Sequence, residues 1–376
     1  MNHAERLARA ALSRLSEPGD PRFTELTTEL GAVELHERLL AQRDVNDLLA
    51  DVALRLASAE PQRELDRAAR LGIRFVIPGD AEWPDQVGDL AGAGELHERG
   101  GAPIGLWVKG PLRLDQLAGS VAVVGSRSST TYGDSAAGEI GAMVARSGAA
   151  VISGAAFGID QAAHRGAIAM DRPTVAVLAC GADKVYPEAH TALIRHIAAT
   201  GAVVSEAALG CAPQRVRFLA RNRLIAALAR GTVIVEAANR SGALNTANWA
   251  NRLHRVVLGV PGPVTSATSA GVHHLIRTGG AGLVTNGAEV LEAIGAAGDH
   301  LLEDPRGPAT ARDRLSTRQQ QVLDAVPVSR GAGSDSVART AGLGLVEVRR
   351  ALTHLEQRGL VERSDDGWRL AALAHT

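Results

Sequence analysis

The chain has 376 residues, more than one hydrophobic core usually organises, so we expect two or three domains. Its 45% hydrophobic and 22% charged residues are typical of a soluble globular protein. The formal net charge of −1 excludes a generally basic surface, so any contact with nucleic acid has to come from a local cluster of charge.

Cysteine usage and the N-terminal segment favour a cytoplasmic protein. Cys180 and Cys211 are too few for a disulfide framework, and we interpret Cys180 as a core thiol. Residues 1–15 are charged throughout and lack the apolar centre of a signal peptide. Since no run approaches the roughly 20 apolar residues of a membrane span, we expect no membrane partner.

Residues 1–72 are predicted to form an N-terminal helical domain. Apolar residues recur at helical spacing in two places, which are Leu7, Ala11 and Leu15, and then Leu48, Val52, Leu54 and Leu56. The breaker sequence PGDP at 18–21 separates the first helix from the second. The sequence leaves open whether these helices contact protein or nucleic acid, or only stabilise the rest of the chain.

Residues 73–296 alternate short apolar runs with helical stretches, which predicts an α/β domain with an extended Rossmann-like parallel sheet and helices on both faces. The predicted strands are 74–77, 106–109, 121–124, 150–153, 175–179, 203–205, 232–235, 256–260 and 283–285. The predicted helices between them include 135–146, 161–170, 189–199, 222–229 and 246–253. Because ligands of such sheets bind beyond the carboxyl ends of the strands, the residues after each strand are the candidates for function.

The last part of the chain is predicted to be a linker, residues 297–314, and a winged-helix domain, residues 315–376. The linker has Gly, Pro, Asp and Ala without periodicity. Helices are expected at 317–326, at 334–340 with Ser334 as its cap, and at 346–358, followed by a hairpin around the turn DDG at 365–367. The third helix mixes arginine with glutamate and has little net charge, which leaves open whether the domain reads DNA or, as such domains often do, contacts protein.

The turn after the strand 121–124 is interpreted as a phosphate-binding corner. Gly125 permits a tight turn, and residues 128–131 can cap the helix that follows. Backbone N–H groups and a helix dipole would then face the same anion. Arg127 adds a permanent positive charge at the mouth of this corner.

The loops after the next two strands carry further candidates. Ser153 and Gly154 bring backbone N–H groups to the same sheet edge. Asp160 and His164 share one helix face, either as a functional pair or, as we favour, as a dipole-stabilised acid and a structural histidine; no third ligand stands at metal spacing. Lys184 faces either a ligand or solvent.

Residues 215–255 hold the densest positive charge in the chain. Eight arginines stand against one acid, Glu236, and we expect them to extend the corner into a groove for a nucleic-acid backbone. These arginines are Arg215, Arg217, Arg221, Arg223, Arg230, Arg240, Arg252 and Arg255. The segment 221–223, which includes Asn222, is interpreted as opening a helix, and Gly242 to Thr246 as a second polar glycine turn.

Two common nucleotide motifs are missing. The chain has no G-x-G-x-x-G with a ribose-binding acid after the second strand, which argues against NAD. It also has no G-x-x-x-x-G-K-[ST], which argues against a P-loop ATPase. We therefore expect no cofactor and no metal.

Taken together, the motifs resemble those of the DprA (Smf) family of DNA-processing proteins. They are, in chain order, GSR at 125–127, SGAAFGID at 153–160 with AH at 163–164, CGADKVYP at 180–187, SE at 205–206, RNRLIAAL at 221–228, VEA…SGALNTA at 235–247 and VPG…LI…GG at 260–280. The resemblance covers about residues 73–290. It implies a non-catalytic protein that binds single-stranded DNA, protects it during natural transformation, helps to load the RecA recombinase, and forms a homodimer through the Rossmann domain.

Carried over to this sequence, the resemblance implies a DNA site with Arg127 on a phosphate, Gly125 and Ser126 supplying N–H groups, and Arg221 and Arg223 extending the basic pocket. The other residues of this set are Ser153, Gly154, Lys184, Asn222, Gly242 and Thr246. The chain departs from the family pattern at Phe157, His190, Leu219 and His274. Phe157 is suited either to base stacking or to the core.

One alternative remains open, a nucleotide-binding or phosphoribohydrolase-like enzyme on the same sheet. Such enzymes have the motif PGGxGTxxE. This chain has Trp249 at the position of the catalytic glutamate, which disfavours the enzyme.

Overall fold

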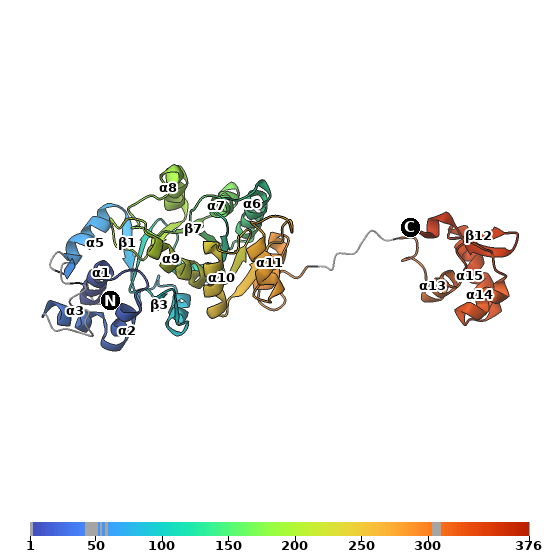
Figure 1. The fold of residues 1–376 in the computed structure, drawn as a ribbon, viewed down its shortest axis with the longest axis horizontal. Helices are drawn as coiled ribbons and strands as arrows, with labels where there is room; N and C mark the ends of the chain where they lie inside the picture. The colour runs from blue at the N-terminus through green and yellow to red at the C-terminus, as the bar shows by residue number, and fades with distance from the viewer. Residues whose placement is uncertain (1–2, 42–51, 53–54, 57–58, 303–309, 376) are drawn as a thin grey trace. The chain divides into compact units, whose positions relative to one another are not determined.

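The computed structural model describes residues 3–41, 52, 55–56, 59–302 and 310–375 (Figure 1). Contacts group the chain into two compact units, Met1–Leu302 and Glu303–Thr376, and the division falls inside the predicted linker. Leu48 and Leu54 of the second predicted helical repeat lie outside the described residues. Among the residues described, no helix has the length and apolarity needed to cross a membrane.

The described residues at the start of the first unit form the helices α1 (His3–Leu15), α2 (Pro21–Leu30), α3 (Ala32–Leu40) and α5 (Pro61–Arg70), which cluster at one end of the sheet (Figure 1). The predicted break between α1 and α2 is confirmed, and the Asp20 side chain caps α2 by accepting from the Arg22 N–H at 3.1 Å. Ser13 of α1 accepts a hydrogen bond from the buried Trp107 indole at 3.1 Å. Ala10 of α1 and Ala68 of α5 also pack with Phe75 and Trp107, so these two helices lie directly on the sheet. The expected boundary at residue 72 stays a prediction.

A nine-stranded sheet forms the centre of this unit, as the α/β prediction required. Its order is β1-β4-β8-β7-β6-β5-β9-β10-β11. The strands are β1 (Ile73–Val76), β4 (Leu106–Lys109), β5 (Val121–Val124), β6 (Val151–Ser153), β7 (Thr174–Val177), β8 (Ala202–Ser205), β9 (Gly231–Ile234), β10 (Val256–Gly259) and β11 (Gly282–Leu283). The sheet is not fully parallel, because β4 runs antiparallel to both of its neighbours, β1 and β8.

Helices cover both faces of the sheet, and alternation along β5 shows how. Val121 and Val123 pack with α6 (Thr131–Arg146), α7 (Ile159–Ala169) and α12 (Gly287–Ile294). Ala122 and Val124 pack on the other face, against α9 (Arg215–Leu228), α10 (Gly242–Arg252) and the 3-10 helix η1 (Asp85–Gly92). The other helices that the structure describes in this unit are η2 (Leu114–Leu117), η3 (Glu188–His190), α8 (Thr191–Thr200) and α11 (Ala270–Arg277).

The strand order reverses direction between β5 and β9. From β5 the chain builds β6, β7 and β8 on one side and then returns to place β9, β10 and β11 on the other. The helices that follow β5 and β9, α6 and α10, consequently lie on opposite faces. Such a reversal leaves a crevice at the carboxyl ends of the two strands, which is where open α/β sheets bind ligands.

A short hairpin, β2 (Glu95–Leu96) and β3 (Arg99–Gly100), stands apart from the main sheet. From residue 310 to residue 375, the second unit has the predicted order of three helices and a hairpin. These elements are α13 (Thr317–Asp324), α14 (Ser334–Ala341), α15 (Leu345–Gln357), β12 (Val361–Ser364) and β13 (Gly367–Leu370), followed by the 3-10 helix η4 (Ala372–His375). The predicted cap is wrong, because Gly333 precedes α14 and the Ser334 hydroxyl accepts from the Trp368 indole at 3.2 Å. Its assignment as a winged helix stays a prediction.

Candidate functional site

A cavity of about 900 Å³ lies at the carboxyl ends of β5 and β9, in the crevice left by the strand reversal. Its walls are the loop after β5, one side of α9 and the start of α10. Four of its lining residues are cations, Arg127, Arg215, Arg221 and Arg240. Among the described lining residues, Asp160 is the single acid. The cavity therefore suits a ligand with several negative charges.

The predicted phosphate corner is filled by the protein itself. Glu236, which is buried, accepts from the Thr130 N–H at 2.9 Å and from the Thr130 hydroxyl at 2.7 Å at the start of α6. The Glu236 carbonyl takes the Ser126 N–H at 2.7 Å. The expectation that the Ser126 N–H would hold a phosphate is therefore wrong, because this N–H and the Thr130 N–H are already bonded within the protein. Gly125 is needed for packing, because a Cβ there would lie 2.6 Å from Ile159.

Arg127 remains available to a ligand after this correction. Its side chain is exposed and lies over the Phe218 ring at 4.6 Å from the centroid. Among the described residues it forms no ion pair. A guanidinium held by an aromatic face but not neutralised by a carboxylate keeps its charge for an incoming anion.

An aromatic pocket lies next to Arg127. Phe157, Tyr186 and Phe218 line it together with Arg127 itself. Phe157 is 46% exposed and packs edge-on against His190, with 4.5 Å between the ring centroids. Tyr186 packs edge-on against Phe218, with 5.8 Å between the centroids. Of the two roles left open for Phe157, the exposed ring excludes the core position. Exposed rings beside an unpaired cation suit the flat faces of nucleobases.

Arg221 sits in the floor of the cavity. It is 6% exposed, donates to the Val177 carbonyl at 3.2 Å and lies 4.0 Å from the Asp160 carboxylate. Burial lowers the pKa of Arg221, Asp160 opposes this, and Arg127 lowers it further; an arginine nevertheless stays charged in proteins. Gly154 is required here because a Cβ would overlap the Arg221 guanidinium.

Asp160 and His164 have separate structural roles, as the favoured interpretation predicted. Asp160 accepts from the Gly154 and Ala156 N–H groups at 3.1 and 3.4 Å. His164 is fully buried, its Nδ1 is 2.8 Å from the Thr174 hydroxyl, and burial lowers its pKa to about 3. The Cys180 thiol is also buried, which raises its pKa to about 11, so it is a core thiol as expected.

The structure places the other predicted site residues in three ways. Asn222, Gly242 and Thr246 line the cavity, and Asn222 Nδ2 donates to the Gly242 carbonyl at 3.2 Å. Ser153 is buried and donates to the Val123 carbonyl at 2.7 Å instead of facing the cavity. Lys184 is exposed and outside the cavity lining.

Two predicted helix starts are wrong. Helix α9 begins at Arg215, so the segment 221–223 lies in its middle and offers no free N–H groups. Helix α10 begins at Gly242, capped by the Ser241 hydroxyl that accepts from the Ala243 N–H at 3.3 Å. Gly242 to Thr246 is thus the first part of a helix, not a turn.

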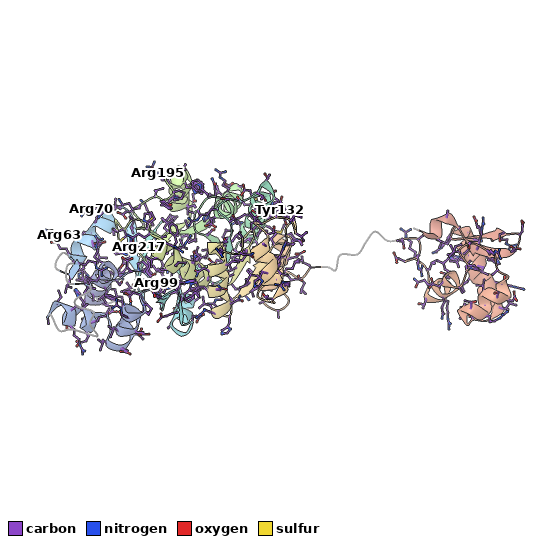
Figure 2. The ribbon with its side chains drawn as sticks, viewed as in Figure 1. Arg63, Arg70, Arg99, Tyr132, Arg195 and Arg217 are labelled. Carbon is purple, nitrogen blue, oxygen red and sulfur yellow. The ribbon has the colours of Figure 1, made fainter. Side chains whose placement is uncertain are left out.

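The prediction that the arginines of segment 215–255 line a single groove is wrong. Arg223 is fully buried and forms two hydrogen bonds with the Glu206 carboxylate, at 2.6 and 2.7 Å. Arg217, which Figure 2 labels, pairs with Glu17 at 2.8 Å. The other arginines of the segment outside the cavity lining are Arg230, Arg252 and Arg255. Of these, Arg255 pairs with Asp89 at 2.6 Å.

Sequence reasoning missed Phe218 and did not single out Arg215 or Arg240. Had α9 been predicted from Arg215, the spacing of Arg215, Phe218 and Arg221 by three residues would have placed them on one helix face. Nothing else in the sequence of the segment indicated that the Phe218 ring belongs to the site, because the residues that it contacts, Arg127 and Tyr186, are distant in sequence.

Comparisons with known proteins agree with this architecture. The sequence profile of the family described as DNA recombination-mediator protein A matches residues 74–295. A putative DNA processing protein DprA of Mycobacterium tuberculosis (strain H37Rv) is 43% identical over 371 residues, covering 96% of this chain and 93% of that protein. Protein Smf of Escherichia coli K12 is 36% identical over 316 residues, covering 80% and 78%.

Two solved structures are similar as well. DprA of Streptococcus pneumoniae superposes with a TM-score of 0.63 at 29% identity, covering 77% of this chain and 98% of that one. DprA of Helicobacter pylori, whose structure is described as giving insight into its single-stranded DNA binding mode, has a TM-score of 0.50 at 25% identity. It covers 58% of this chain and 94% of that one.

Proposed function

The chain belongs to the DprA (Smf) family of DNA-processing proteins, and from this premise we propose that it binds single-stranded DNA in the cavity between β5 and β9. One observation carries the proposal. Arg127 is exposed, forms no ion pair with any residue that the structure describes, and adjoins a pocket that includes the exposed rings of Phe157 and Tyr186. Phosphates and unstacked bases are the two groups that such a surface recognises.

The chemistry of the lining residues indicates which part of the DNA each of them would bind. Arg127, Arg215 and Arg240 are exposed and hold backbone phosphates, while Arg221 contributes charge from the floor. Phe157, Tyr186 and Phe218 receive bases, which single strands can offer and paired strands cannot. The site consequently prefers single-stranded to double-stranded DNA and reads little sequence.

The test compares binding of a fluorescent single-stranded oligonucleotide and its duplex by anisotropy. Wild type binds the single strand more tightly, and Arg127→Ala weakens this binding. Arg195→Ala is the matched control, because Arg195 projects outward from α8, away from the cavity lining (Figure 2). Equal affinity for both DNA forms, or a loss as large in the control as in Arg127→Ala, would contradict the proposal.

We also propose, on the strength of family membership, that the cytoplasmic protein protects incoming DNA in transformation, delivers it to RecA, and acts as a homodimer through the α/β unit. Sedimentation of the purified chain tests the dimer. The delay before RecA filaments form on single-stranded DNA tests delivery, and the protein should shorten it. An unchanged delay would contradict RecA loading without affecting DNA binding.

We propose no chemical step for this site. Trp249 is fully buried in α10, and the Glu236 carboxylate is committed to Thr130 and, at 3.1 Å, to the Thr268 hydroxyl. Asp160 is held by backbone N–H groups. Release of free base from nucleoside monophosphates would contradict this and favour the phosphoribohydrolase alternative.

A further inference from the structure

The β2–β3 hairpin has an unusual turn. Its two central residues, His97 and Glu98, have φ values of 54° and 58°. Two-residue turns with both φ values positive normally use Gly, which has no Cβ, or Asn, whose short amide can form local hydrogen bonds in this region. A histidine and a glutamate here cost stability, and backbone strain of this kind concentrates where it serves function.

The hairpin is firmly attached at its base. The Gly100 carbonyl accepts from the buried Arg223 Nε at 3.3 Å, and the Gly100 N–H donates to the Gly19 carbonyl at 3.0 Å. Two residues before the hairpin, the Ala93 carbonyl accepts from Arg252 of α10 at 3.1 Å. Figure 2 labels Arg99 on this hairpin. The hairpin is thus tied to α9, to α10 and to the loop before α2, so the position of its tip is set by the fold.

The tip meets the candidate DNA site. His97 is exposed and lines the same cavity as Arg127, Arg215 and Arg221. Glu98, its neighbour in the turn, is exposed but does not line it. Of the two strained residues, the one that reaches the cavity therefore has the flat aromatic ring and the one outside it has the carboxylate. That distribution suits a polyanion with planar bases.

We propose that the β2–β3 hairpin is a wall of the DNA site and that the His97 imidazole stacks on a nucleobase. The inference rests on the proposed single-strand binding. It extends that proposal because His97 does not line the aromatic pocket beside Arg127 and would therefore be a second, separate base contact. Imidazole is among the rings on which unstacked bases pack. A bound strand then runs between two aromatic contacts, with the arginines of the cavity along its backbone.

The decisive variant is His97→Asn, because asparagine tolerates the left-handed conformation and removes the ring. We expect its unfolding temperature to equal or exceed that of wild type, while affinity for single-stranded DNA falls by about 5- to 150-fold, the range for loss of one stacked base. Glu98→Asn is the matched control, with the same conformational relief and wild-type affinity or better.

A second readout separates stacking from a structural role. His97→Phe keeps a ring and should restore most of the lost affinity. Quenching of 2-aminopurine in the oligonucleotide, a probe of base stacking, should fall with His97→Asn and return with His97→Phe. Wild-type affinity and quenching in His97→Asn would overturn the inference while leaving single-strand binding intact, provided that Arg127→Ala still loses affinity. If neither His97→Asn nor Arg127→Ala changes the affinity for single-stranded DNA, both the stacking by His97 and the proposed DNA site are wrong.

Discussion

Arginines lie on two sides of α9, where one side leaves them available to a ligand and the other side pairs them with carboxylates. On the cavity side Arg215 is exposed without an ion pair among the described residues, and Arg221 is 4.0 Å from its nearest carboxylate. On the side toward the N-terminal helices, Arg217 and Arg223 each form paired hydrogen bonds with a carboxylate, Glu17 and Glu206. Whether an arginine is available to a ligand thus depends on the acid that the fold brings to it, and not on the local density of arginine.

The largest expected effect comes from breaking the buried ion pair between Arg223 of α9 and Glu206. Glu206→Gln leaves the fully buried Arg223 guanidinium without a counter-charge, so the free energy of unfolding should fall by about 3–5 kcal/mol. Urea unfolding measures it. The control is Glu188→Gln, an exposed glutamate, expected within about 0.5 kcal/mol of wild type. Equal stability of both variants would show that the pair behind α9 is not structural.

A substitution on the cavity side tests how tightly its floor is packed. In Gly154→Ala the new methyl group overlaps the Arg221 guanidinium, which must move. We expect a loss of about 1–3 kcal/mol in stability, as for other overpacked sites, together with weaker binding of single-stranded DNA. Gly119→Ala, where a Cβ has open space, should change neither. A neutral Gly154→Ala would mean that Arg221 is not fixed in the floor.

The pair between Arg217 and Glu17 should matter less than the buried one. The Glu17 side chain is 32% exposed, so solvent screens the pair. A double-mutant cycle with Glu17→Gln and Arg217→Gln should give a coupling energy of about 1 kcal/mol. A coupling as large as that expected behind Arg223 would remove the distinction between partly exposed and buried pairs on this side of α9.

The smallest effect is expected from removing the second unit. The cavity is built entirely from residues of the first unit, so a chain ending at Leu302 should bind single-stranded DNA with wild-type affinity. Anisotropy titrations of the two chains check this. A large loss in the shortened chain would instead make the predicted winged helix the main DNA reader.

Much of the fold could be predicted because its signals are local. The strands Leu106–Lys109 and Val121–Val124 have the predicted bounds, since buried strands are short apolar runs closed by glycine or proline. The antiparallel direction of β4 could not be read, because strand direction depends on partners that are distant in sequence. The start of α9 was missed for a different reason, since its first turn is charged and lacks a capping side chain.

The site was predictable in its position but not in its pairing. Arg127 and the strand end that precedes it follow from the sheet pattern alone. That Glu236 fills the corner, and that Glu206 neutralises Arg223, depends on side chains 106 and 17 residues away in sequence. No periodicity or composition reports such contacts, so the predicted groove contained Arg223 and omitted Phe218.

The central claim is that the exposed arginines of the cavity, and not the paired ones behind α9, hold the DNA backbone. The salt dependence of single-strand affinity tests it most directly. Arg127→Ala should reduce the slope of log affinity against log salt by about 0.7, the value for one phosphate contact on a single strand, while folded Arg217→Ala keeps the wild-type slope. An unchanged slope in Arg127→Ala, or an equal reduction in both variants, would contradict the account.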